Sequence, residues 1–428
     1  MKKVHIFGGG TVSHVRPHLA LCAPAYGNTA RQIEILCKKR LEKLIVEKHL
    51  TTMAGGDFET NKDISNYINY LIGRPDTKII FMSCALVDFR GYVDYKLMYK
   101  ESYHGKYGER LDSKNDYHII IRPVDKLISE IRRIRKDIFL VGFKITCGDS
   151  EQSQYLKGLN LLKSSSCNLV LANDVKTRLN MVITPEEAKY HVTTDRLEAL
   201  QGLVDMTYLR SHLTFTRSTV VAGEPVSYNS ELVPSSLRAI IDYCVKRGAY
   251  KPFRGATVGH FAVKVNENTF LTSIRKSNFN DIDKNGLVMV KTDGPDSVIA
   301  YGAKPSVGGQ SQRIIFNEHS DYDCIVHFHC PQKGNLVPTI SQREYECGSH
   351  ECGRNTSRGL KKFGNLSAVY LDNHGPNIVF NRSIDPQEVI NFIDENFVLE
   401  EKTGGYVSLG QILNTNDSLE DLNDVATY

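Results

Sequence analysis

The sequence lacks the features that mark a membrane-bound, secreted or nucleic-acid-binding protein. None of its apolar runs approaches the ~20 residues needed to cross a bilayer, and no apolar signal region precedes the first glycines. No dense block of lysine and arginine stands out, and a formal charge of +4 is small for 428 residues. We therefore expect a cytoplasmic protein that binds neither membranes nor nucleic acid.

Disulfide and zinc-knuckle patterns are also missing. The ten cysteines are scattered, and several lie in apolar segments, as buried free thiols do. Cys347 and Cys352 flank a candidate site, but their spacing is not that of a zinc knuckle. With no secretory signal, this usage indicates a reducing compartment. The chain length predicts two or three domains of ~150–200 residues.

The first half alternates segments typical of strands and helices. A buried strand at residues 3–7 runs directly into Gly8-Gly9-Gly10-Thr11, an arrangement that presents backbone N–H groups to phosphate in open α/β sheets. The dinucleotide spacing G-x-G-x-x-G is absent. This half is expected to form a mainly parallel sheet covered on both faces. We expect helices at residues 32–49, 62–72, 124–135 and 152–163, and strands at residues 78–83, 138–143 and 168–172.

Residues at several of these strand ends form a recognisable set. They are Gly9-Gly10-Thr11 with Val15-Arg16, residues 85–88, Val141-Gly142-Phe143-Lys144 and Leu171-Ala172-Asn173-Asp174. Together they resemble phosphopantothenoylcysteine synthetase over residues 3–180. The resemblance implies a Rossmann-like domain that activates a carboxylate with ATP or CTP and Mg²⁺. It also implies that Gly9, Gly10 and Thr11 lie beside phosphate, and that Asn173 and Asp174 contact polar groups of the ligand.

The chain departs from that family at two functional positions, and at one of them the family's lysine before the fourth strand is replaced by Arg110, which keeps the charge but not the shape. The family has an asparagine, followed by Ser-Ser-Gly, that helps to hold the activated acyl intermediate, whereas this chain has Cys-Ala-Pro-Ala-Tyr-Gly-Asn at residues 22–28. That asparagine therefore has no clear counterpart. We favour a nucleotide-binding domain over an active pantothenate ligase, and a Rossmann-like scaffold without a ligand is the other alternative.

Residues 218–234 separate the two halves. Their periodicity is weak, which indicates an extended linker or a strand that crosses between domains. A helix is expected at residues 237–246. We therefore expect an α/β protein with a Rossmann-like, mainly parallel N-terminal domain at residues 1–228, an α/β/α domain at residues 229–412 and an acidic tail at residues 413–428.

The second half is organised around residues 324–330, Cys-Ile-Val-His-Phe-His-Cys. We expect a strand here, because Ile, Val and Phe favour strands. Side chains alternate along a strand, so His327 and His329 would project from one face and could hold one metal ion. Two unrelated core or surface histidines are the alternative. Further strands are expected at residues 257–264, 269–273, 287–291 and 368–376, and helices at residues 309–316 and 386–397.

This order of elements, over residues 236–400, resembles the class II aldolase/adducin family. Lys304-Pro305-Ser306 lies at the family's distance before His327, and His374-Gly375 fits the family's last metal ligand. The resemblance implies a class II aldolase-like domain in which His327, His329 and His374 hold Zn²⁺ or a similar divalent metal, with one position open for a substrate oxygen. It also implies a homo-oligomer, a tetramer as in class II aldolases.

The same resemblance places a substrate phosphate in a loop pocket. Gly259, Thr272, Ser273 and Ser306 stand at the corresponding positions, with Lys276 as a further charge. Ordinary turn chemistry is the alternative for these small residues.

The acid–base residue distinguishes two branches of this family. Sugar-phosphate aldolases carry a glutamate two residues after the serine of Pro-Ser, and this chain has Gly308 there. A branch resembling methylthioribulose-1-phosphate dehydratase uses a later glutamate, which corresponds to Glu351 here, with His350 and Glu346 as weaker alternatives. Glu351 would remove a proton next to a carbonyl while the metal holds the negative oxygen. A solvated loop position is the alternative for Glu351.

These observations predict a zinc-dependent lyase, a dehydratase or an aldolase, acting on a small phosphorylated sugar or related carbonyl compound and fused to a nucleotide-binding, ligase-like domain. One alternative is an ATP- or CTP-dependent phosphopantothenate–cysteine-type ligase with the second domain as an accessory. The other is a binding module without activity, as in adducin-like members of the second family.

Overall fold

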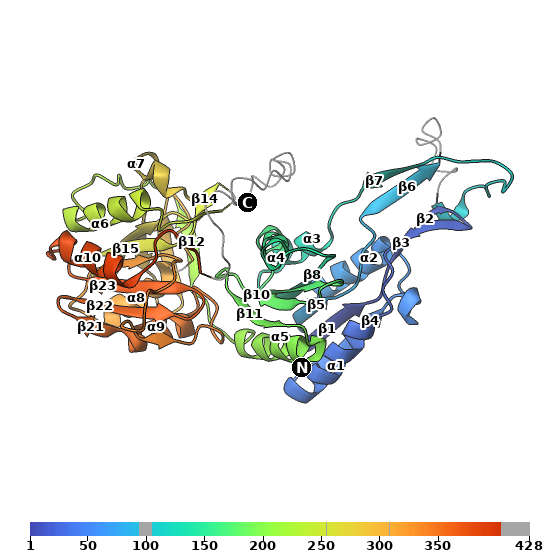
Figure 1. Ribbon diagram of the computed structural model, residues 1–428, viewed down its shortest axis with the longest axis horizontal. Coiled ribbons are helices and arrows are strands. Elements are labelled where there is room, and N and C mark those ends of the chain that lie inside the picture. Colours follow the sequence, from blue (N-terminus) through green and yellow to red (C-terminus); the bar gives the residue numbers. More distant parts are fainter. Residues whose placement is uncertain (94–104, 254, 308, 404–428) are drawn as a thin grey trace. The chain divides into compact units, whose positions relative to one another are not determined.

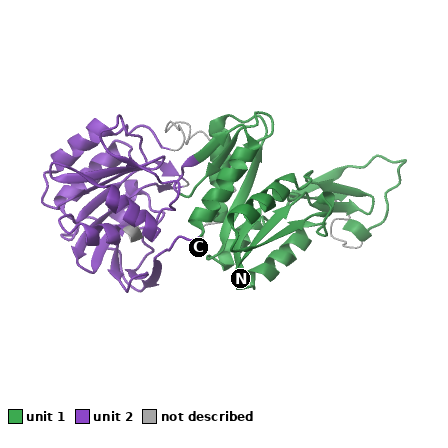
Figure 2. Ribbon diagram, turned by 90° about the horizontal axis from the view of Figure 1, so that it is seen from below, with its two compact units in different colours: residues 1–185, 190–211 green, residues 186–189, 212–428 purple. Residues whose placement is uncertain are grey.

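The computed structural model describes residues 1–93, 105–253, 255–307 and 309–403. The expected tail at residues 413–428 and Gly308 lie outside these ranges. Figure 2 shows two compact units: unit 1 comprises residues 1–185 and 190–211, and unit 2 comprises residues 186–189 and those from 212 onward. Within the described ranges, no helix has both the length and the apolar character needed to span a bilayer.

Unit 1 contains a seven-stranded sheet in the order β11-β10-β9-β8-β5-β1-β4. The pairings from β4 across to β9 are parallel, and β10 pairs antiparallel with β9. The central strands bury nearly every side chain, as strands covered on both faces do. The strands are β1 (Lys3–Gly8), β4 (Ile45–Leu50), β5 (Thr77–Met82), β8 (Phe139–Thr146), β9 (Leu169–Asp174), β10 (Asn180–Ile183) and β11 (Lys189–Thr193).

Helices cover the sheet of unit 1, with α1 and α5 packed together and α3 in contact with both α2 and α4 (Figure 1). Their bounds are α1 (Asn28–Arg40), α2 (Asn61–Ile72), α3 (Ile128–Ile134), α4 (Glu151–Ser165) and α5 (Arg196–Arg210). Two small antiparallel strand pairs accompany them, β2 (Val12–Arg16) with β3 (Leu19–Cys22) and β6 (Phe89–Val93) with β7 (Ile119–Pro123).

The helix expected at residues 32–49 is wrong in its second half. Helix α1 ends at Arg40, and residues 45–50 form the edge strand β4, which pairs with β1. The charged residues of this segment have good helix propensity, but pairing with a buried strand outweighs a preference worth less than ~1 kcal/mol per residue.

Unit 2 contains a ten-stranded mixed sheet in the order β12-β18-β17-β16-β15-β19-β23-β22-β20, with β21 paired to β22. Its strands are β12 (Arg217–Val221), β15 (His260–Asn266), β16 (Thr269–Ser273), β17 (Leu287–Thr292), β18 (Ser297–Tyr301), β19 (Cys324–His327), β20 (Thr339–Ile340), β21 (Lys361–Phe363), β22 (Leu366–Leu371) and β23 (Gly375–Phe380). Most pairings are antiparallel, and β12–β18 and β20–β22 are parallel. A separate pair is formed by β13 (Pro252–Phe253) and β14 (Ala256–Thr257).

Helices lie on both faces of this sheet, so unit 2 has the expected α/β/α layers. One face carries α6 (Ser235–Lys246) and α10 (Pro386–Asn396), which contact each other, and the other carries α8 (Gly309–Glu318) and α9 (His350–Gly359). The short helix α7 (Ile282–Asn285) precedes β17. The expected α/β fold class, with a mainly parallel N-terminal sheet, is confirmed.

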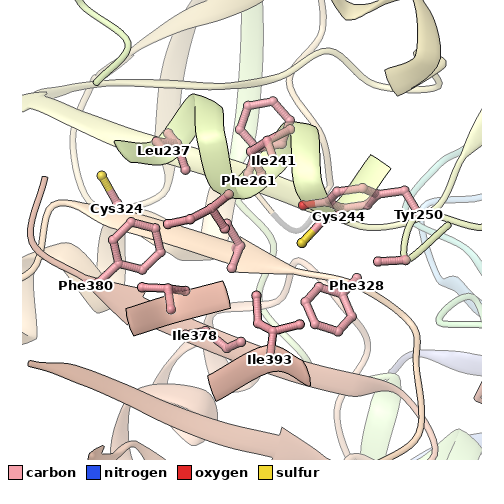
Figure 3. Packing of buried hydrophobic residues seen from close by; sticks show 14 of the residues in the cluster. Leu237, Ile241, Cys244, Tyr250, Phe261, Cys324, Phe328, Ile378, Phe380 and Ile393 are labelled. Atoms are coloured by element: carbon pink, nitrogen blue, oxygen red, sulfur yellow. The ribbon is translucent and has the colours of Figure 1, made fainter. Parts of the chain in front are cut away.

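The core of unit 2 fixes the orientation of β19. Figure 3 shows Leu237 and Ile241 of α6 and Ile393 of α10 packed with Phe328 and Phe380. Cys324 and Val326 of β19 belong to the same cluster, whereas Ile325 packs with Ile315 and Phe316 of α8 on the opposite face. Because side chains alternate along a strand, His327 faces the α8 side.

Candidate metal centre

Three histidines come together at the end of β19. His327 is the last residue of β19, His329 follows two residues later, and His374 lies in the turn between β22 and β23. All three side chains are buried, with residues only 1–6% exposed. One ring nitrogen from each lies within 4.8 Å of the other two. The chain therefore brings together the three histidines that the sequence singled out.

The strands that carry these histidines are shorter than expected. The strand expected at residues 324–330 ends at His327, where the pairing with His260 of β15 and Asn377 of β23 ends. The strand expected at residues 368–376 is two strands, because Asn373 and Gly375 take φ angles of +54° and +149° and turn the chain. His329 and His374 are thus held by turns, and only His327 by a strand.

The orientation of His327 prepares one nitrogen for a metal. Its Nδ1–H donates to the backbone oxygen of Pro376 at 2.8 Å, so the lone pair is on Nε2. That Nε2 lies 3.2 Å from Nε2 of His374, and two nitrogens bound tetrahedrally at ~2.05 Å to one ion are ~3.3 Å apart. Burial lowers the pKa of His327 to about 4, so the ring is neutral at pH 7. The donor set fits Zn²⁺ or a similar divalent ion.

A network of buried polar groups fixes the two turns. The backbone N–H of Thr403 donates to the oxygen of His329 at 3.2 Å, and its hydroxyl donates to the oxygen of His374 at 2.5 Å. The preceding residue, Lys402, forms a buried ion pair with Glu187 at 2.5 Å. Sequence reasoning missed Glu187 and Thr403, because they act through a distant ion pair and backbone contacts and carry no local pattern.

We expect Glu187→Gln to destabilise the protein by ~3–5 kcal/mol, because the Lys402 ammonium, 3% exposed, would lose its buried partner. The free energy of unfolding from urea titration measures this loss. The matched control is Glu400→Gln, which removes the exposed partner of Arg247 and is expected to cost at most ~1 kcal/mol. Equal losses in both variants would contradict a special role for the buried pair.

A small cavity adjoins the three histidines. His260, Gln312 and Cys352 line it together with His327 and His374. The His260 ring centroid lies 4.7 Å from that of His327, and burial, with the nearby His327, holds the pKa of His260 well below its usual range. Among the described residues, the buried Nε2 of Gln312 has no hydrogen-bond partner. A ligand in the cavity could accept from this amide.

The four residues expected at a substrate phosphate divide into two groups. Gly259 precedes β15, Ser273 ends β16, and the N–H of Ser306 donates to the oxygen of Ser273 at 3.0 Å, so these three lie at the sheet edge where β19 ends. Thr272 instead directs its buried hydroxyl to the oxygen of Phe261 at 3.0 Å. The buried hydroxyl of Ser273 has no partner among the described residues. Their role at a phosphate stays a prediction.

Glu351 lies in the first turn of α9, whose N-terminus is capped by the Ser349 hydroxyl. Its carboxylate accepts the backbone N–H of Thr214 at 3.0 Å. The next residue, Cys352, lines the cavity, whereas Glu351 does not. The weaker alternative, His350, shares a hydrogen bond with the Thr216 hydroxyl at 2.8 Å. Neither position is a solvated loop, and catalytic roles for both stay predictions.

The glycine turn of unit 1 is packed tightly against neighbouring loops. Gly9 has a φ of +95°, and a Cβ on Gly10 would lie 1.7 Å from the oxygen of Ala23. The N–H of Gly10 donates to Ala25 at 2.8 Å and that of Thr11 to Ala85 at 3.0 Å. These two donors are thus used inside the protein, and close packing alone requires glycine here. A phosphate role for Gly9, Gly10 and Thr11 stays a prediction.

Asn173 and Asp174 end β9. The Asp174 carboxylate accepts the backbone N–H groups of Thr177 at 2.8 Å and Gly148 at 3.0 Å, and these hydrogen bonds hold its pKa well below the usual range. Asp174 therefore joins two loops at this end of the sheet, and contact of Asn173 and Asp174 with a ligand stays a prediction. A cavity of about 280 Å³ in unit 1 is lined by Ala23 and residues 86–89, beside the glycine turn.

Residues 240–385 match the family model described as Class II Aldolase and Adducin N-terminal domain. The resemblance expected for the second half is thereby confirmed, and His327, His329, His374 and Glu351 all lie within the match. No curated protein sequence matches the chain.

Solved structures similar to the chain share little sequence with it. The DNA/pantothenate metabolism flavoprotein from Streptococcus pneumoniae is 16% identical over 48% of this chain and 96% of its own, with a TM-score of 0.38. The C-terminal domain of the coenzyme A biosynthesis bifunctional protein CoaBC is 12% identical over 49% and 94%, with a TM-score of 0.35. An L-fuculose 1-phosphate aldolase is 18% identical over 37% and 79%, with a TM-score of 0.28.

Proposed function

We propose that unit 2 is a divalent-metal-dependent lyase, a dehydratase or an aldolase, acting on a small phosphorylated sugar or related carbonyl compound. The observation that carries the proposal is the convergence of three buried imidazoles beside a small cavity. The location of all three within the matched residues 240–385 supports it.

His327, His329 and His374 would hold the ion, which when bound stabilises negative charge on a substrate oxygen. The hydrogen bond from His327 to Pro376 keeps the first ring in the ligating tautomer. Thr403 holds the backbone of the other two histidines. Burial of the three rings excludes bulk water and strengthens electrostatic interactions in the site.

The cavity and the nearby edge of the sheet offer polar groups for the substrate. The amide of Gln312 is a buried donor, and the hydroxyl of Ser273 lies at the edge of the sheet beside Ser306. Gly259 has a φ of +113°, and a Cβ there would lie 2.6 Å from the oxygen of His327, so the chain passes close to the centre. We assign the substrate phosphate to this edge, where Gly259, Ser273 and Ser306 lie.

Glu351 is our proposed general base. We expect Glu351→Gln to retain the metal and lower kcat by ~10²–10⁴-fold, because an amide cannot take up the proton. The amide oxygen can still accept the N–H of Thr214, so the fold should be retained. Metal analysis and steady-state kinetics test this, with Glu344→Gln as a surface control. Unchanged turnover would place the base elsewhere.

The experiment that tests the whole proposal uses tag-free protein and a panel of phosphorylated ketoses and aldoses. Proton exchange in D₂O and product identity by NMR report enolisation, dehydration or carbon–carbon cleavage. Activity that disappears after chelation and returns with Zn²⁺ or another divalent ion is expected. Protein that contains no metal, takes up none and processes no member of the panel would contradict the proposal.

For unit 1 we propose binding of ATP or CTP with Mg²⁺, without requiring ligase activity. The supporting observation is that β1 and β9 belong to the parallel part of one sheet. Gly9–Thr11, directly after β1, and Asn173–Asp174, at the end of β9, therefore lie at the same edge of that sheet. A nucleotide at ~100 times its Kd should stabilise the folded state by ~2.7 kcal/mol. We expect a rise in the melting temperature with one of the two nucleotides; no shift with either would exclude a working site.

A further inference from the structure

A second cluster of metal-ligating side chains lies in unit 1, far along the sequence from the three histidines of unit 2. It consists of His5 on β1 and Glu47 and His49 on β4. The parallel register places His5 opposite Glu47 and Phe7 opposite His49. Because side chains alternate along strands, all these residues project from the same face of the sheet.

The ligand-capable atoms of this cluster converge on one point. One donor atom from each residue lies within 4.8 Å of the other two. Nδ1 of His5 lies 3.0 Å from Nε2 of His49 and 3.4 Å from Oε2 of Glu47. Two imidazoles and one carboxylate, with a fourth position for water, are a donor set that Zn²⁺ takes in proteins.

The surroundings of the cluster hold these donors in place. The second oxygen of Glu47 accepts from Lys3 at 2.7 Å, which orients the carboxylate toward His5. The His49 ring packs against Phe7 and Tyr67, with centroids 5.0 and 4.7 Å away. Glu47 is 32% exposed and gives an ion a path from solvent. The carboxylates of Glu47 and Asp76 balance the ammonium of Lys3 and the guanidinium of Arg74, so the surrounding charges do not repel a cation.

The hydrogen bond between the two rings does not satisfy both of them. His5 is 1% exposed, and among the described residues its Nε2 has no hydrogen-bond partner. A ring that shares one proton with His49 through Nδ1 leaves this buried nitrogen unsatisfied, which costs ~1–3 kcal/mol. An ion bound by Nδ1 of His5 and Nε2 of His49 would put the ring protons on Nε2 of His5 and Nδ1 of His49 with no net release. Within the described part of the chain, the Nε2 of His5 is unpaired with or without the ion, so the support for a metal comes from the convergence of the donor atoms.

We propose that His5, Glu47 and His49 form a second divalent-metal site, with Zn²⁺ as the best-fitting ion, that ties the edge strand β4 to β1. The site is independent of the centre in unit 2 and of its proposed activity. The site connects two paired strands, and none of its three residues lines the 280 Å³ cavity of unit 1. We therefore assign it a structural role.

The test uses Co²⁺ as the probe and the tag-free full-length chain carrying His327→Ala and His329→Ala, which removes the other candidate centre. We expect one Co²⁺ per chain by equilibrium dialysis, with the visible absorption of a tetrahedral site. Adding Glu47→Gln or His49→Gln should weaken binding by at least ~10-fold. The control is His18→Gln, an exposed histidine of the same unit, which should leave binding unchanged.

If the double variant does not fold, the otherwise unaltered chain answers the question, since His49→Gln should then lower the cobalt content by one ion per chain. Circular dichroism checks that each variant is folded. A folded double variant that binds no Co²⁺, or binding that persists unchanged in both Glu47→Gln and His49→Gln, would overturn the proposal.

Discussion

A chain that carries His327→Ala is expected to lose the divalent metal of unit 2 and to show no measurable lyase turnover. His327 is the ligand with the most rigid support, since its backbone pairs with strands on both sides and its Nδ1 is fixed by Pro376. Loss of an outer-shell partner already costs 10–100-fold in metal affinity, so we expect more than ~100-fold for a ligand. Metal content after dialysis and the kcat of the proposed reaction measure both effects.

A matched control separates loss of a ligand from loss of a buried ring. His319→Ala removes a partly buried histidine of the same unit that bonds to Ser357, and it should keep both metal and turnover. His260→Ala is more informative, because the His260 ring lies beside that of His327 but is not one of the three converging histidines. Metal retention in His260→Ala with loss in His327→Ala would support the assignment, whereas retention in both would refute it.

The local sequence pattern predicted an element correctly where the element depends mainly on its own residues. The expected helix at residues 62–72 matches α2, which a Thr60–Asp63 capping box starts. The local pattern gave the wrong prediction where pairing with a distant strand determines the structure. Residues 45–50 have a helical pattern, but they form a strand that pairs with β1. The strand expected at residues 324–330 ends at His327, because the pairing of β19 with β15 and β23 ends there, and no sequence pattern in the strand itself encodes that.

The candidate site shows the same division. His327 and His329 were singled out by their alternation along an apolar segment, and His374 by the resemblance to the class II aldolase/adducin family; the structure brings the three together. The surrounding network was not found, because its members contribute through backbone contacts or distant ion pairs. Thr403 acts through its own N–H and hydroxyl on two backbone oxygens, and Lys402 pairs with Glu187. Such contacts depend on the folded chain and leave no periodic signal.

Gly375→Ala is expected to destabilise unit 2 by ~3 kcal/mol or more and to weaken metal binding. The residue has a φ of +149°, which side chains rarely adopt, and strain of this kind alone costs ~1–3 kcal/mol. A Cβ would also lie 2.1 Å from the oxygen of Phe328 and 3.2 Å from Cα of His329. Both are backbone atoms, so no side-chain rotation relieves the clash, and the chain on either side of it carries a ligand, His329 or His374.

The measurement is urea unfolding together with the Kd for Zn²⁺, compared with Gly334→Ala, where a new Cβ meets no atom within 4 Å. We expect the control to change stability by at most ~0.5 kcal/mol. If Gly375→Ala lowers stability but leaves metal affinity unchanged, the turn does not position His374. If both properties equal those of the control, the close approach of the two histidine-bearing segments is not a requirement of the fold. Loss of both properties only in Gly375→Ala would show that the same backbone contact supports the fold and the metal centre.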